Sequence, residues 1–243
     1  MPVRVFLLAT ALAALLPAQN REVRRVLEAA DVFDEVMGIK DRAIPQELLD
    51  RAECVGIVPA LKKGAFIVGG QYGKGVVTCR PEHGEGWTGP STIRMEGGSF
   101  GLQIGGAEVD LVLLIMNKRG FDRLLRSKFT LGGGATVSAG PVGRSAAAET
   151  DALLSAEILA WSRARGLFAG VSLTGSTLRQ DSGDNEKIYG KAVTARQILR
   201  EGEHPPESVQ KLAETISKYS SRKHRFKADT QIKAENTDAP KTP

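Results

Sequence analysis

The chain has 243 residues, enough for one domain of ordinary size with a sizeable buried core. Apolar residues make up 42% of it and charged residues 25%, the balance of a soluble globular protein, and 27 glycines against 5% aromatic residues favour Gly-rich β-structure. The net charge of +5 allows weak attraction to anionic surfaces but does not specify nucleic acid, so we expect no nucleic-acid partner.

The first 18 residues have the pattern of a secretory signal peptide. One basic residue, Arg4, precedes an apolar run over 5–16 that is too short to span a bilayer. We expect residues 1–18 to be removed by cleavage after Ala18, which would make the mature protein periplasmic or extracellular and peripheral to a membrane. A buried N-terminal helix is the alternative interpretation.

Two helices and a series of strands follow. Apolar residues from Arg21 to Met37 are spaced to lie on one helical face, and a short second helix begins near Pro45. The runs “VGIVP”, “AFIVGGQYG” and “GVVTCR”, broken by “ALKKG” and by glycines, predict hairpin-connected strands, as do “TIRMEGGSFGLQIGG” and “VDLVLLIMN”. For Cys54 and Cys79 the sequence leaves two alternatives open, a disulfide and two buried reduced thiols.

The second half of the chain continues with mixed elements. A helix is expected from Asn117 to Arg126, and “ATVSAGPVG” predicts a strand. The stretch “AEILAWSRARGLFAGVSLTGSTL” suits a helix by propensity in its first half and alternates as a strand in its second, and we favour a hairpin that turns near Gly166. Thr194 caps a helix toward Arg200, Pro205-Pro206 begins another, and residues 221–243 form a disordered tail.

These elements predict an α+β fold for a single domain over residues 21–220. We expect a strongly bent, Gly-rich antiparallel sheet or partial barrel, flanked by N- and C-terminal helices. Glycines within strands permit the curvature that closes such a sheet.

Two glycine-rich stretches resemble catalytic or phosphate-binding motifs but fail on context. In “VGGQYGKGVV” a Walker loop would need glycine at Val68 and a hydroxyl residue at Gly75, and a strand follows where a helix is required. “GGSFG” places Ser99 as in a nucleophile elbow, but again no helix follows. The three histidines are poor partners for such a serine. We therefore expect no enzyme and no catalytic residue.

The acidic stretch “RQDSGDNEKIYG” invites a calcium interpretation through Asp181, Asp184 and Glu186. Its spacing does not fit an EF-hand loop, so we favour an acidic turn. The sequence also has no Cys/His cluster for zinc. Neither a metal nor a cofactor is expected.

Basic residues gather at the predicted hairpin tips and at the start of the mature chain. Lys62 and Lys63 lie at one tip and Arg163 and Arg165 at another, and we expect all four to be exposed. Ordinary surface charge is the simpler explanation, and the acidic later part of the first helix weakens a membrane-surface interpretation of that helix. “SKYSSRKHRFK” is either a lipid contact or a solvated tail. The candidates for binding anionic lipid head groups are Arg21, Arg24, Arg25, Lys62, Lys63, Arg163 and Arg165.

Several motifs together resemble one known family. “PALKKGAFIVGGQYGKGVV”, “GGSFGLQIGGAEVDLVLLIMN”, “KFTLGGGATVSAGPVGR”, “WSRARGLFAGVSLTGS” and “DNEKIYG” occur in the order found in the SYLF domain family, which includes yeast actin regulators that bind the protein Las-seventeen. The resemblance runs from about Val23 to Tyr219. It implies a non-enzymatic module that binds membrane lipids, phosphoinositides in eukaryotic members, and actin in the fungal ones.

The resemblance also bears on single residues. It places Lys63 on the lysine that follows the family's strand-ending proline and Phe66 on its aromatic residue, while Trp161 replaces a usual tyrosine and Arg165 a usual lysine. It further implies an N-terminal helical segment that contributes apolar and basic side chains to lipid binding. Because an exported protein would not meet its own cell's actin, we expect binding to anionic phospholipid membranes. The alternative is a protein-interaction or scaffold domain.

Overall fold

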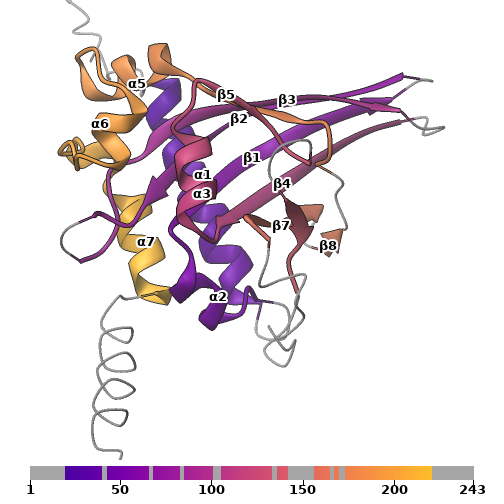
Figure 1. Cartoon of the computed structure of the whole chain (residues 1–243), viewed down its shortest axis with the longest axis horizontal. Helices are drawn as coiled ribbons and strands as arrows, with labels where there is room; N and C mark the ends of the chain where they lie inside the picture. Colours follow the sequence, from indigo (N-terminus) through magenta and orange to yellow (C-terminus); the bar gives the residue numbers. More distant parts are fainter. Residues whose placement is uncertain are drawn as a thin grey trace, which may run out of the picture.

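The computed structural model describes residues 20–39, 43–65, 68–82, 85–100, 105–132, 136–141, 156–164, 167–169 and 173–220. The expected signal peptide and tail lie outside the described residues, as do Phe66 and Arg165. Within the described part, the chain has an α+β fold with a strongly curled, mainly antiparallel sheet and helices from both ends of the sequence, as predicted (Figure 1). None of the described helices is long and apolar enough to cross a membrane.

One sheet holds all the described strands, in the order β5-β9-β3-β2-β1-β4-β7-β6, with β8 paired to β7. Every pairing is antiparallel except that of β6 with β7. The hairpin expected near Gly166 is the β7–β8 pair. The strands are β1 (Cys54–Ala65), β2 (Val68–Cys79), β3 (Ser91–Phe100), β4 (Gly105–Ile115), β5 (Lys128–Thr130), β6 (Val137–Ala139), β7 (Ile158–Ala164), β8 (Leu167–Ala169) and β9 (Thr177–Gln180).

The helices gather at one end of the long strands, and β1–β4 extend beyond them as an arm (Figure 1). We use this term for residues 62–65, 68–72, 96–100 and 105–108, which pair with one another across the four strands. The helices are α1 (Arg21–Gly38), α2 (Gln46–Arg51), α3 (Lys118–Leu124), α5 (Ser182–Tyr189), α6 (Ala195–Leu199), the 3-10 helix η1 (Glu207–Val209) and α7 (Lys211–Tyr219).

Local sequence signals explain where several helices begin. The Asn20 side chain accepts a hydrogen bond from the backbone N–H of Glu22, and Asn117 caps α3 in the same way. Thr194 and Gln197 form a capping box at α6, close to the predicted start. The prediction of a single helix that begins at Pro205-Pro206 is wrong in one respect, because a 3-10 helix, η1, comes first and the α-helix α7 begins only at Lys211.

Apolar side chains fill both faces of the sheet, because successive residues of a strand point to opposite faces. On one face, Ile57 and Leu114 pack with the buried faces of α1, α2 and α7. On the other face, Val58, Leu113 and Leu178 join residues of α3 and α6. The sheet is therefore the middle layer that holds the helices in place.

The “ALKKG” segment was expected to interrupt a strand, but it lies inside β1. Val58 pairs with Leu111 and Leu61 with Val109, so β1 has one extra residue here and forms a bulge. Ala60 takes a positive φ of 52° at the bulge, and its N–H donates to the Asp110 carboxylate over 3.1 Å. A long-range hydrogen bond thus holds what resembles a turn in the sequence.

The stretch from 68 to 77 belongs to one strand, β2, which agrees with the rejection of a phosphate loop. β2 passes so close to the bulge of β1 that a Cβ atom at Gly75 would lie 2.2 Å from the carbonyl oxygen of Ile57. At this position the glycine is required by close strand contact.

Two other expectations are settled by the fold. The acidic turn predicted around Asp181 and Asp184 is wrong, because Asp181 caps helix α5 and Asp184 lies within it. Cys54 and Cys79 face each other across β1 and β2, and a disulfide joins them. Both are buried against the face of the sheet that contacts α6.

Candidate functional site

Arg163 was expected to be an exposed residue at a hairpin tip, and this is wrong. It lies within β7 with its side chain 12% exposed, and its guanidinium bridges Asp110 of β4, at 2.9 Å, and Glu35 of α1. Burial by itself would lower the pKa of Arg163, but hydrogen bonds to both carboxylates outweigh it and raise that pKa. Arg163 therefore helps to hold α1 and the β1 bulge.

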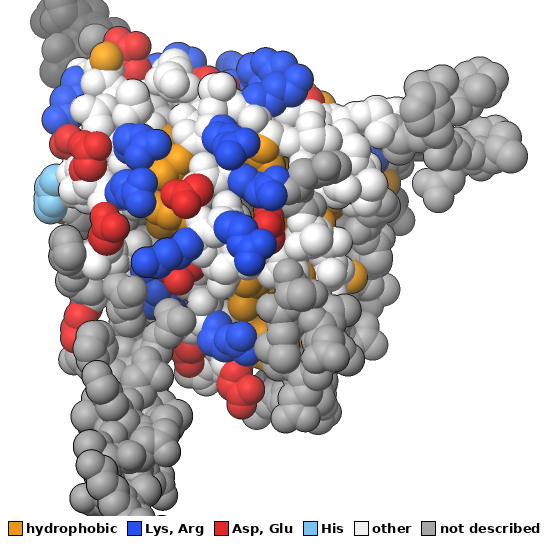
Figure 2. All heavy atoms as spheres, viewed as in Figure 1, with side chains coloured by type: hydrophobic (Ala, Val, Ile, Leu, Met, Phe, Trp, Pro, Cys, Tyr) orange, Lys and Arg blue, Asp and Glu red, His pale blue; other side chains and the backbone are white. Residues whose placement is uncertain are grey.

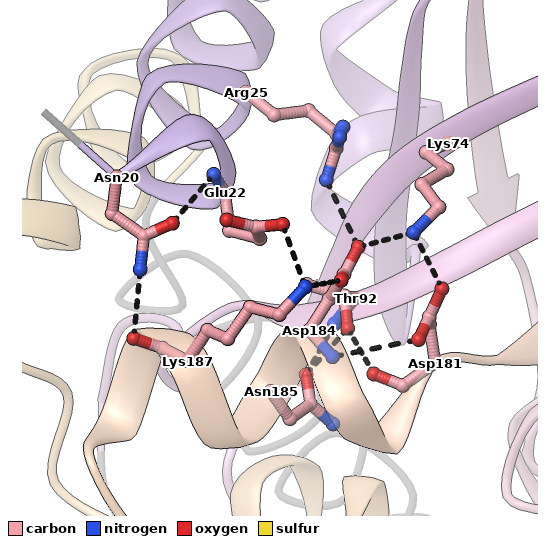
Figure 3. Close-up of polar contacts among 9 residues, drawn as sticks. All are labelled: Asn20, Glu22, Arg25, Lys74, Thr92, Asp181, Asp184, Asn185 and Lys187. Atoms are coloured by element: carbon pink, nitrogen blue, oxygen red, sulfur yellow. Dashed lines mark hydrogen bonds and ion pairs between the residues drawn. The ribbon is translucent and has the colours of Figure 1, made fainter.

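Arg25 is engaged in a similar way. It lies 3.2 Å from a carboxylate oxygen of Asp184, which is only 2% exposed (Figure 3). Lys74 of β2 contacts the same oxygen at 2.6 Å and Asp181 at 2.9 Å, while Lys187 contacts the other oxygen of Asp184 at 3.0 Å. Three cations from α1, β2 and α5 thus surround one buried carboxylate.

These contacts shift the pKa values of the network. Burial would raise the pKa of Asp184, but hydrogen bonds from Lys74 and Lys187 lower it. Burial would likewise lower the pKa of Lys74, and its bonds to Asp184 and Asp181 raise it instead. Lys74, the lysine of the “VGGQYGKGVV” stretch that resembles a phosphate loop, is therefore paired with carboxylates.

The network also fixes the beginning of α1 to α5. Lys187 donates to Glu22, and the Asn20 side chain donates to the backbone carbonyl of Lys187 (Figure 3). No group of three or more His, Cys, Asp or Glu side chains in the described part of the chain is arranged to hold a metal. This cluster is best explained as a structural anchor for α1.

The apolar face of α1 is buried. Val26, Ala30 and Phe33 pack on the sheet and on α7 with no exposed surface. The apolar contribution that the resemblance assigns to an N-terminal helix would therefore need α1 to leave the sheet. Of its basic residues, Arg24 pairs with Glu28 on the helix surface and Arg21 is exposed.

Lys62 and Lys63 lie in the arm, inside β1, a few residues before the β1–β2 connection at 66–67. Lys62 is exposed and Lys63 is half-buried, and burial lowers the pKa of Lys63. Neither makes an ion pair with any described residue. Together with Glu108 they line an open groove that also reaches Asp110 and Arg163.

A basic region that sequence reasoning missed lies on α3 and the start of β5. The segment from Lys118 to Lys128, “KRGFDRLLRSK”, contains five cations and one carboxylate. Arg123 pairs with Glu157, but the other four cations are exposed and have no ion pair within the described ranges. We call these four the α3–β5 surface: Lys118, Arg119, Arg126 and Lys128.

Further cations adjoin this surface across the sheet edge. Lys128 of β5 lies opposite Arg179 of β9, which in turn lies opposite Arg94 of β3. Glu96 is shared by the two arginines, at 2.7 Å from Arg94 and 3.6 Å from Arg179. Lys128, Arg179 and Arg94 face a single carboxylate, so this row retains an excess of positive charge.

Figure 2 shows Lys and Arg side chains gathered where Figure 1 draws α3, with acidic side chains between them. The sequence signal for this region was available, because “KRGFDRLLRSK” is a basic run. Its apolar spacing predicts a helix and does not by itself indicate a binding surface. Arg94 and Arg179, by contrast, are too far apart in sequence to be recognised as neighbours without the sheet register.

The described part of the chain is therefore an α+β domain with a curled, mainly antiparallel sheet, helices from the N- and C-terminal parts of the sequence, and exposed cationic surfaces. The model of the family described as “Ysc84: Las17-binding protein actin regulator” matches residues 96–219, from β3 to the end of α7. The chain belongs to this family. The resemblance to the SYLF domain family is thereby confirmed.

Relatives extend the match toward the N-terminus. LAS seventeen-binding protein 3 of Saccharomyces cerevisiae is 35% identical over 202 residues, which cover 81% of this chain and 43% of that protein. SH3 domain-containing YSC84-like protein 1 is 32% identical in Homo sapiens over 75% of this chain, and 30% identical in Xenopus laevis over 85%. The chain spans less than half of the yeast relative and 53% to 62% of these vertebrate ones.

Proposed function

We propose that this domain binds membranes that contain anionic phospholipids, without catalysing a reaction. The observation that carries the proposal is the α3–β5 surface, where four exposed cations have no carboxylate partner among the described residues. Each Lys or Arg near an anionic membrane contributes on the order of 1 kcal/mol of attraction. Lys62 and Lys63, also unpaired in the described part, form a second contact on the arm.

A lipid surface suits these cations better than nucleic acid does. Binding of single-stranded nucleic acid without sequence preference relies on exposed aromatic side chains that stack on bases. Among the described residues the exposed large hydrophobic side chain is Tyr72, which lies on the arm and not on the α3–β5 surface. Long, separate Lys and Arg side chains match a layer of mobile head-group phosphates.

We also propose that the protein is exported. The pattern of residues 1–18 and the buried Cys54–Cys79 disulfide both support an oxidising compartment. Export favours a membrane partner, since an exported protein does not meet the actin of its own cell. The alternative, a protein-interaction domain, is supported by the relatives named for binding Las17.

Co-sedimentation of the chain with vesicles of phosphatidylcholine, with and without phosphatidylglycerol, tests the proposal. Serine replacement of the four cations of the α3–β5 surface should weaken binding to the anionic vesicles by at least about two orders of magnitude at low salt. The matched control removes the same net charge from four exposed cations that have carboxylate partners, and it should change binding by no more than about threefold. Its positions are Arg24, Lys191, Lys211 and Lys218.

A Lys62→Ser/Lys63→Ser variant measures the arm separately, with an expected loss of at least about tenfold. Melting curves separate lost binding from unfolding, because surface changes of this kind shift stability by only about half a kcal/mol each. If the parent chain ignores phosphatidylglycerol at low salt, lipid binding is refuted. A saturable protein partner with no lipid dependence would then favour the scaffold alternative.

A further inference from the structure

A pocket lies beside the α3–β5 surface, between α3, α6 and the ends of β1 and β2. Its volume is about 130 Å³, below the range of pockets for drug-sized ligands and suited to a small polar group. Phe121 and Leu199 give it an apolar part. The other described residues of its walls include three cationic and three carboxylate side chains, so the charge balance inside the pocket decides what it can bind.

Two of the three cations in the pocket already have partners. Arg80 is 5% exposed, donates to the backbone carbonyl of Ala52 and to Ser220, and lies over the Trp87 ring at 4.3 Å. The Arg200 guanidinium lies between two exposed carboxylates of the pocket rim, 3.8 Å from Glu82 and 3.9 Å from Asp122. The two positive charges of Arg80 and Arg200 equal in number the two negative charges of Glu82 and Asp122. Two charged side chains of the pocket remain.

The remaining two charges are Lys118 and Glu53, one of each sign. Neither makes an ion pair with a described residue, although both line the same pocket. The backbone fixes their relative position, because the N–H of Glu53 donates to the carbonyl of Ile115, three residues before Lys118 begins α3. Among the described residues that line the pocket, one anion and one cation are thus left without an ion pair, next to an apolar surface.

We propose that this pocket binds a small zwitterion, with the ligand's ammonium group at Glu53 and its phosphate or carboxylate group at Lys118. The ligand chemistry has two sources, the head group of an ethanolamine phospholipid and a free zwitterionic metabolite. The lipid source rests on the proposed function, whereas the preference for a zwitterion rests on the pocket alone.

Soluble probes test the preference directly. Glycerophosphoethanolamine carries a phosphodiester and an ammonium group, and glycerophosphoglycerol carries the same phosphodiester without the ammonium. Titration followed by NMR should show that the parent chain binds glycerophosphoethanolamine about tenfold more tightly, the effect of one charge-assisted contact. The shifted amide signals should include those of Glu53, Lys118 and Phe121.

Two conservative variants should change the affinity for glycerophosphoglycerol in opposite directions. Lys118→Gln should weaken both probes about tenfold, because both use the phosphate contact. Glu53→Gln should weaken glycerophosphoethanolamine about tenfold but strengthen glycerophosphoglycerol, since a repelling carboxylate is removed. A damaged fold would weaken both probes in either variant, so the stronger binding of glycerophosphoglycerol by Glu53→Gln is the result that separates a lost contact from damage. Asp31→Asn, at an exposed ion pair with Lys211 away from the pocket, is the control and should change neither affinity.

The proposal would be overturned if the parent bound the two probes with equal affinity, or if the Glu53→Gln variant still preferred glycerophosphoethanolamine as strongly as the parent does.

Binding to vesicles distinguishes the two sources of the ligand, a lipid head group and a free molecule. If replacing phosphatidylcholine by phosphatidylethanolamine at constant phosphatidylglycerol tightens binding of the parent but not of Glu53→Gln, the ligand is a lipid head group. If the soluble probes discriminate and the vesicles do not, the zwitterion is a free molecule. If the parent binds the soluble probes but no vesicles, the proposed membrane function is refuted and the proposal that the pocket binds a zwitterion still holds.

Discussion

Replacement of Asp184 by asparagine should destabilise the fold strongly, because it breaks the anchor between α1, β2 and α5. Asp184 is 2% exposed and lies within 3.2 Å of Arg25, Lys74 and Lys187. Removing one partner of a buried ion pair typically costs about 3–5 kcal/mol, since it leaves uncompensated charge. Lys74 keeps its contact with Asp181, so we expect the lower end, about 3 kcal/mol of unfolding free energy.

The same change should alter the pH dependence of stability. The pKa of folded Asp184 lies below its ordinary value of 3.8. Its contribution is therefore complete above the unfolded pKa and is lost as the pH falls through the lower folded pKa. Lys74 behaves in the opposite sense, because its pKa is raised above 10.5, so its contribution is lost only as alkaline pH rises through that folded value.

Urea unfolding followed by circular dichroism, at neutral pH and at several values below pH 4, measures both effects. The parent should lose stability across the acidic window more steeply than Asp184→Asn does. Asp31→Asn is the control, because its ion pair with Lys211 is exposed and such pairs contribute at most about 1 kcal/mol. A loss below about 1 kcal/mol in Asp184→Asn, or an acid slope equal to that of the parent, would refute this account of the network.

Two more predictions concern the sheet. Gly75→Ala should cost about 1–3 kcal/mol or more in urea unfolding, because its Cβ would meet the backbone of β1, whereas Gly64→Ala, with open space around it, should cost less. An equal loss in both variants would contradict the close-contact explanation. Reduction of the Cys54–Cys79 disulfide, whose partners are 25 residues apart, should remove about 3.5 kcal/mol, measured by unfolding with and without reductant. An unchanged transition under full reduction would contradict it.

Much of the fold could be predicted from local patterns. The apolar spacing from Arg21, the Thr194 cap before α6 and the hairpin near Gly166 each depend on neighbouring residues, and the structure contains the corresponding elements. The β1 bulge could not be predicted in this way. “ALKKG” resembles a turn, and it remains in the strand because Asp110, 50 residues away, accepts a hydrogen bond from Ala60.

The candidate site depended even more on distant residues. The sequence places Lys62 and Lys63 near a hairpin, and Lys62 is exposed as expected while Lys63 is half-buried. Arg163 and Arg25 could not be recognised as members of internal ion pairs. Their partners Asp110 and Asp184 are 53 and 159 residues away. Sequence reasoning sees the sign of a charge but not the carboxylate that neutralises it.

This difference changes which surface is best suited to a membrane. Three basic residues lie within the first five positions of α1, yet Arg25 is bound by Asp184 and Arg24 by Glu28. α1 also supplies Glu35, which neutralises Arg163. The attraction to an anionic layer depends on the charges that no internal partner compensates. By that measure the α3–β5 surface, with four unpaired cations among the described residues, should dominate binding, and α1 should serve chiefly to close the core.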